Sequence, residues 1–122
     1  MDVAVAALAV VAAALHVAFF ALEALLWRRP AVHRVFGARD AAQAEQLSTA
    51  FFNLGFYNLF LGLGTAAGVW WWLSDGDVAL LIFCLSFMIG AAVVLVAHSR
   101  RMWRGALIQG LTPSVALVLL AM

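Results

Sequence analysis

The sequence has few charged residues and a single cysteine, and both shortages exclude classes of protein. Asp, Glu, Lys and Arg make up 11% of the 122 residues, whereas hydrophobic residues make up 67%. A soluble domain could not cover its surface with so few charges. The lone Cys84 excludes a disulfide or a thiolate-cluster metal site within one chain. The net charge of +1 argues against a nucleic-acid partner.

The hydrophobic residues fall into four runs, each long enough to cross a bilayer as a helix of about 20 residues. We predict spans at about residues 3–27, 48–73, 78–98 and 105–122, joined by short loops within one domain over residues 1–122. The expected fold class is therefore all-α, an integral membrane four-helix bundle. Residues 39–47 have helix-forming composition, and we favour the first turns of a longer second helix over a separate interfacial helix.

The arginines lie in two of the three loops, and their distribution predicts the orientation of the bundle. Four lie between the first two spans and three between the last two, whereas the middle loop and the amino terminus carry only acids. By the positive-inside rule, both basic loops face the cytoplasm and both chain ends face out. We therefore expect a multi-pass protein of the bacterial inner (cytoplasmic) membrane, with membrane lipids as partners.

Polar side chains inside the predicted spans lie in the cytoplasmic half or near the middle of the bilayer. Glu23 is the most informative, because an acid buried in a bilayer costs at least a few kcal/mol. His16 precedes it by seven residues, so both side chains point to one side of the first helix. By helical rise, Asn53 on the second span and Gln109 on the fourth are expected at a depth similar to that of Glu23, with Tyr57 and Asn58 about a turn deeper. The sequence thus predicts an inner-leaflet polar pocket between the first, second and fourth helices.

Some of these polar residues have a structural interpretation as well. Amide side chains often hydrogen-bond between membrane helices, so Asn53, Asn58 and Gln109 could simply hold the bundle together. His98 borders an arginine-rich loop and is interpreted as interfacial. His33 lies in the first loop, where nothing in the sequence favours a function.

One pattern of residues resembles a known family. The pattern is His16, Glu23 and Trp27, then Asn53-x-Gly55-x-Tyr57-Asn58, then Gln109 and Pro113. It resembles a bacterial family of small four-span membrane proteins catalogued as domain of unknown function thirteen-oh-four, over nearly the whole chain. This chain has Leu54 where the family often has glutamine. The resemblance implies the fold and a shared polar pocket but no reaction. Some members carry an epoxidase label, yet no flavin or haem motif that would activate oxygen occurs here.

The polar residues favour a membrane enzyme that acts on a lipophilic substrate by acid–base chemistry. Glu23 would donate a proton, His16 would act as a base or stabilise a developing cation, and Tyr57 would assist as a donor. Asn53, Asn58 and Gln109 would orient the substrate oxygen. Trp27, Phe20 and Phe56 would line an apolar wall. We expect epoxide opening, isomerisation or cyclisation, by an isomerase, cyclase or hydrolase.

Two other functions stay open from the sequence. In a proton-coupled exporter, Glu23 would exchange protons for a small molecule. In a metal- or haem-binding protein, His16, Glu23 and His98 would supply ligands, although helical rise separates the first two by about 10 Å. We predict no cofactor, while a metal or haem is not excluded. Four short helices enclose little volume, so we expect a homo-oligomer.

Overall fold

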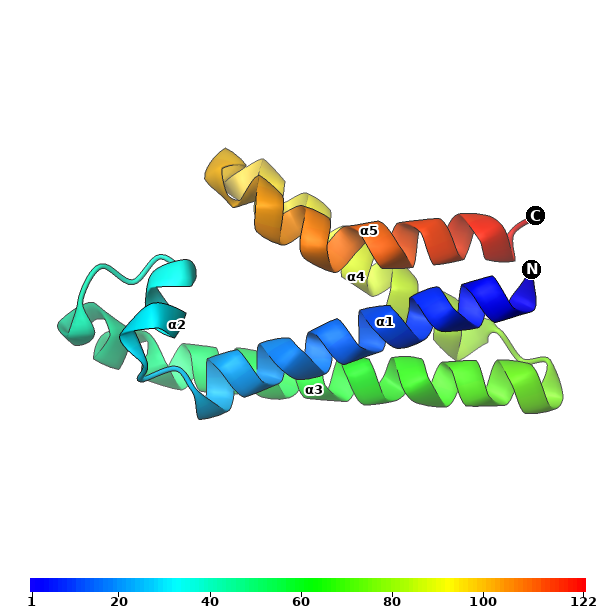
Figure 1. The fold of residues 1–122 in the computed structure, drawn as a ribbon, viewed down its shortest axis with the longest axis horizontal. Helices are drawn as coiled ribbons and strands as arrows, with labels where there is room; N and C mark the ends of the chain where they lie inside the picture. Colours follow the sequence, from blue (N-terminus) through cyan, green and yellow to red (C-terminus); the bar gives the residue numbers. More distant parts are fainter.

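In the computed structural model, which describes residues 1–122, four long helices pair as two antiparallel hairpins (Figure 1). Helix α1 (Asp2–Phe20) continues as the π-helix η1 (Ala21–Leu25), and both pack along α3 (Ala41–Asp75). Helix α4 (Ala79–His98) packs along α5 (Trp103–Leu120), with the 3-10 turn η2 (Arg100–Met102) between them. A short helix, α2 (Pro30–Val35), lies in the connection between η1 and α3. The all-α fold class predicted from the sequence is confirmed.

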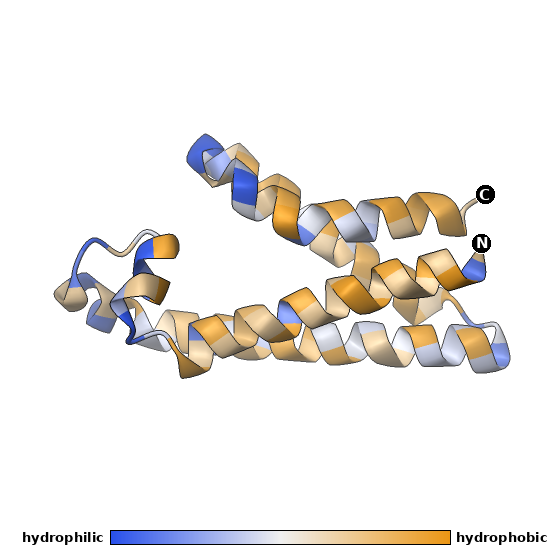
Figure 2. Cartoon of the chain, viewed as in Figure 1, coloured by the Kyte–Doolittle hydropathy of each residue, from blue (hydrophilic) through white to orange (hydrophobic).

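Four helices are long and apolar enough to cross a membrane: Asp2–Leu25, Ala41–Asp75, Ala79–His98 and Arg100–Leu120. Large apolar side chains such as Phe60, Val94 and Val118 are exposed on them, as expected of surfaces that face lipid. Figure 2 shows hydrophobic residues along all four helices and strongly hydrophilic residues concentrated near their ends. The chain is therefore a multi-pass membrane protein. We call the end that carries the arginine-containing connections the basic end, and the opposite end, with Asp2, Asp75 and Asp77, the acidic end.

The connection between the first two spans contains more helix than the loop that the sequence suggested. Pro30 takes the first position of α2, where its missing N–H is not needed. Asp40 caps α3 by accepting the backbone N–H of Gln43 at 2.8 Å. Residues from Ala41 onward are thus the first turns of a longer second helix, as the composition favoured. Its 35 residues span about 52 Å, so α3 extends beyond a hydrocarbon core of about 30 Å.

The buried apolar side chains form two separate cores. The main core lies toward the acidic end and joins all four long helices through Ala9, Ala12, Val69, Leu81, Leu85, Met88 and Ala116. The cap core lies at the basic end and consists of Trp27, Ala38 and Ala44. In Figure 1 the two hairpins lie together near the chain termini and apart at the basic end. Glu23 lies between the two cores along the first span.

Gly68 determines how closely α3 approaches α4. A Cβ atom at this position would lie 2.8 Å from the backbone nitrogen of Leu81 and 2.9 Å from its Cα. Because backbone atoms cannot rotate away, we expect Gly68→Ala to lower the free energy of unfolding by about 1–3 kcal/mol. Thermal unfolding in detergent micelles measures this change. Gly90→Ala is the matched control, since nothing lies within 4 Å of its added Cβ, and equal midpoints for the two variants would contradict the expectation.

Candidate functional site

Glu23 and Asn58 form a hydrogen-bonded pair between the first and second spans. The Asn58 Nδ2 donates to Glu23 Oε2 at 2.7 Å, and the Glu23 side chain is 4% exposed. Gly55 makes the pair possible: a Cβ there would lie 2.9 Å from the Cβ of Ala24 and 3.3 Å from that of Glu23. Without a side chain at position 55, α3 approaches η1 closely enough for the amide to reach the acid.

Glu23 stands in the middle of the π-helical turn. The amide of Leu26 donates to the carbonyl of Ala21 at 2.9 Å, which is a bond to the fifth residue back rather than the fourth. Neither glycine nor proline occurs in Ala21–Leu25, so the turn has no local sequence cause. Such π-turns are rare inside helices and are frequent at functional sites. The turn therefore marks Glu23 as the first residue to consider for chemistry.

His16 lies on the face of α1 that points into the bundle. It continues the buried stripe of Val5, Ala9 and Ala12, which recur every three or four residues. Its Nδ1 donates to the carbonyl of Ala12 at 2.9 Å, since a carbonyl oxygen can only accept. In the neutral ring, Nε2 then carries the lone pair. The structure thus leaves Nε2 as the atom of this ring that can accept a proton.

Asn53 and Tyr57 do not border the same space as Glu23, which corrects the expectation from the sequence. Tyr57 is 69% exposed and Asn53 is also exposed. Each is two residues from Gly55 and so lies about 200° around the helix from the residue that contacts η1. The two do share a face, but it is the face turned away from the first span. Tyr57 is therefore not positioned to donate to a substrate held at Glu23.

Gln109 lies nearer in depth to His16 than to Glu23. Helix α5 packs against α4 and α1, whereas η1 packs chiefly against α3. Ala116 shares the main core with Ala9 and Ala12, and Gln109 is seven residues, or about 10 Å, farther toward the basic end. This register brings half-buried Gln109 to the depth of His16. By this register Gln109 lies at the depth of His16 and not at that of Glu23, contrary to the predicted pocket.

Thr112 is a residue that sequence reasoning missed. It lies one turn from Gln109 on α5, and its buried Oγ1 has no hydrogen-bond partner. A buried hydroxyl without a partner is uncommon. A threonine in an apolar span carries no distinctive sequence signal, so only the structure shows this atom. It adds a second polar group on α5 close to the depth of His16.

The aromatic residues expected to line an apolar wall divide into two groups. Phe20 and Phe56 meet edge to face across α1 and α3, with centroids 5.1 Å apart, close along the chain to Glu23 and Asn58. Trp27 instead belongs to the cap core. Its Nε1 donates to the carbonyl of Ala44 at 2.8 Å, and its ring stacks on Phe51 at 3.9 Å. Trp27 therefore fastens the connection at the basic end to α3.

The protein residues do not assemble a metal site. No group of three or more His, Cys, Asp or Glu side chains could hold a metal ion. His16 and Glu23 lie on the first span, whereas His98 is exposed at the last residue of α4. The ligand set of His16, Glu23 and His98 considered from the sequence is thus not brought together.

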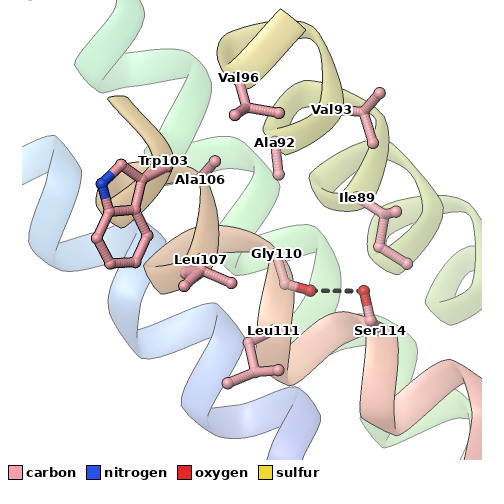
Figure 3. Close-up of a pocket in the computed structure, with 10 residues that line it drawn as sticks. All are labelled: Ile89, Ala92, Val93, Val96, Trp103, Ala106, Leu107, Gly110, Leu111 and Ser114. Carbon is pink, nitrogen blue, oxygen red and sulfur yellow. Dashed lines mark hydrogen bonds between the residues drawn. The ribbon is translucent and has the colours of Figure 1, made fainter. Parts of the chain in front are cut away.

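An apolar groove of about 290 Å³ lies between α4 and α5, on the hairpin that does not carry Glu23 (Figure 3). Its lining is Ile89, Ala92, Val93, Val96, Trp103, Ala106, Leu107, Gly110, Leu111 and Ser114. Figure 3 shows the Ser114 hydroxyl directed at the carbonyl of Gly110, to which it donates at 2.7 Å. The hydroxyl is therefore already used within α5, and the side chains of the groove supply no acid or base.

Comparison with known protein families gives one match. Residues 10–121 match the family described as Protein of unknown function (DUF1304). No curated protein and no solved structure matches the chain. The matched range includes His16, Glu23, Asn58 and Gln109, so the whole candidate site lies within it.

Proposed function

The chain belongs to the family described as Protein of unknown function (DUF1304), and we propose that it is a membrane enzyme acting on a lipophilic substrate by acid–base chemistry at Glu23. The observation that carries this proposal is the buried Glu23–Asn58 pair on a π-turn, with His16 on the same helix. We place the basic end in the cytoplasm by the positive-inside rule, and the protein in a bacterial inner (cytoplasmic) membrane. The site then lies in the inner-leaflet half.

The hydrogen bond from Asn58 assigns different roles to the two oxygens of Glu23. Oε2 accepts the amide N–H, and the carbonyl-type oxygen of a neutral carboxyl group is the better acceptor. The proton of a neutral carboxyl group would then lie on Oε1, which is the atom that gives it to the substrate. In an apolar site no water competes for that proton, and a positioned side chain can transfer it directly.

The separation of Glu23 from His16 bears on the kind of reaction. Seven residues of helix place the two groups about 10 Å apart along the axis, too far to touch one small functional group. An extended apolar substrate could meet both. Protonation of an epoxide oxygen or alkene by Glu23 would create a cation, which the next C=C bonds of an extended polyene would attack in turn, so that the positive charge moves along the chain. His16 Nε2 would then remove a proton from the carbon next to the final cation, and the electrons of that C–H bond would form the new alkene. The substrate gains one proton and loses another, so this geometry supports isomerisation or cyclisation over hydrolysis.

A solvent-isotope experiment tests the proposal. Purified protein in lipid nanodiscs is incubated in D₂O with a panel of long-chain epoxides and polyenes. The products are then separated, and their masses are measured by mass spectrometry. We expect an isomeric product, and from a polyene that product carries one carbon-bound deuterium taken from the solvent. From an epoxide the deuteron ends on a hydroxyl oxygen and exchanges during separation, so the isomeric product itself is the readout. Empty nanodiscs are the control. Failure to form any isomeric product above that control across the panel, or polyene products without carbon-bound deuterium, would rule the proposal out.

A further inference from the structure

A small polar pocket lies at the basic end, beyond the candidate site. Its volume is about 190 Å³, and its lining is Trp27, Arg28, His33, Ala41, Ala44 and Glu45. Sites for drug-sized ligands usually measure about 300–1,000 Å³, so this pocket fits only a small group. Trp27 lies two residues past the end of the first span at Leu25, and tryptophan is enriched where a membrane meets water. The pocket therefore lies at the depth of lipid headgroups.

His33 is the unexplained residue of this pocket. It lies on α2, its side chain is 3% exposed, and its ring packs against Trp27 with centroids 6.2 Å apart. Its buried Nδ1 has no hydrogen-bond partner in the protein. Buried polar atoms are nearly always paired, so an unpaired one calls for a partner from outside the chain. The structure thus places His33 on a helix and buried, where the sequence suggested a loop residue.

The charges around the pocket define what that partner would be. Arg28 and Glu45 line it with opposite charges, and both side chains are exposed enough to reach an incoming group. A guanidinium pairs well with phosphate, and a carboxylate pairs with an ammonium group. The pocket thus offers one place for an anion and one for a cation.

We propose that this pocket binds the aminoethyl phosphate headgroup of a phospholipid, with its phosphate on Arg28 and its ammonium on Glu45. The headgroup has both phosphate oxygens and ammonium N–H groups, so it can pair with His33 Nδ1, whether that atom donates or accepts, once a small rotation of the ring opens the buried atom to the pocket. A trimethylated headgroup has no N–H to donate to Glu45. A purely anionic headgroup would place negative charge beside the Glu45 carboxylate, which repels it. The site stands independently of the proposed chemistry at Glu23.

Native mass spectrometry of the full chain tests this site. The protein is released from micelles that contain equal amounts of phosphatidylethanolamine, phosphatidylcholine and phosphatidylglycerol. We expect phosphatidylethanolamine to be retained at least about tenfold over the other two, as loss of one charge-assisted hydrogen bond implies. Glu45→Gln removes the preference over phosphatidylcholine, and Arg28→Gln lowers retention of the ethanolamine lipid. Arg29→Gln is the matched control, because Arg29 does not line the pocket.

Two further measurements complete the test. One distinguishes a folding defect from loss of the site, and the other distinguishes a lipid headgroup from the free compound. His33→Phe keeps a ring beside Trp27 but removes the nitrogen, and we expect it to weaken retention of the ethanolamine lipid. Should this buried variant fail to fold, the exposed Glu45→Gln carries the test alone. Competition by soluble phosphoethanolamine would show that the free compound also binds, whereas no competition would assign the site to lipid. Equal retention of the three lipids, or retention unchanged in Arg28→Gln and Glu45→Gln, overturns the proposal.

Discussion

Replacing Glu23 with glutamine is expected to slow turnover of the lipophilic substrate by about 10²–10⁴-fold, the contribution typical of a general acid or base. Glutamine has nearly the same shape, and its amide oxygen can still accept the hydrogen bond from Asn58 Nδ2. It has no acidic proton to give. The pair between the spans is thus retained while the chemistry is lost. Initial rates of product formation and of solvent deuterium incorporation in nanodiscs measure the effect.

Tyr57→Phe is the matched control for this experiment. It also removes one ionisable group from the same part of the spans, but that group is 69% exposed on the far face of α3. We expect its rate to equal that of the unmodified protein. A folded Glu23→Gln variant that turns over at the full rate would exclude Glu23 as the acid. A Tyr57→Phe variant as slow as Glu23→Gln would restore the predicted role of the tyrosine.

Replacing Trp27 with alanine is expected to lower the free energy of unfolding of the cap core by about 3–5 kcal/mol, as found for large aromatic side chains in buried sites. The substitution removes the stacking on Phe51 at 3.9 Å and the hydrogen bond to the Ala44 carbonyl. Since these contacts hold the connection to α3, the amides of α2 should lose protection first. Hydrogen exchange of the amides of residues 31–35 in α2, with thermal unfolding in micelles, measures the change.

Two further variants define the origin of that loss. Trp27→Phe keeps an aromatic ring but removes the N–H donor, and we expect a loss of about 1 kcal/mol. Trp70→Ala removes a tryptophan that is 71% exposed, so its effect should be close to zero. If Trp27→Ala were no more destabilising than Trp70→Ala, the cap core would not depend on Trp27.

The four helices follow from hydropathy alone, because a bilayer leaves a spanning segment no other way to pair its backbone. Helical rise gives the depth of a polar residue only to within about a turn: it matched Glu23 with Asn53 and put Asn58 a turn deeper, whereas Asn58 is the residue that pairs with Glu23. To predict which way a side chain points, one must also know which face of its helix contacts the neighbouring helix. Gly55 and Gly62, seven residues apart, mark that face. Measured from them, Asn58 is near the contact and Tyr57 is opposite, so this part could have been derived.

Other features have no comparable signal in the sequence. The π-turn at Glu23 contains ordinary helix formers and depends on packing against α3. Helix α2 has six residues, too few for a hydrophobic period, and its position depends on the distant contacts of Trp27. The burial of His33 is a consequence of that packing. Spacing along the chain could not distinguish it from any histidine in a loop.

The division into two cores gives the molecule a stiff end and a compliant end. Side chains of all four helices interlock only in the main core, so the hairpins near the acidic end should move as one body. Toward the basic end, each helix packs mainly against the other helix of its own hairpin. Fewer contacts there oppose a change in the angle between the two hairpins. Glu23 lies between these two parts of the molecule. On one side is the rigid main core, and on the other is the region where the hairpins can move apart to admit a bulky molecule from the membrane.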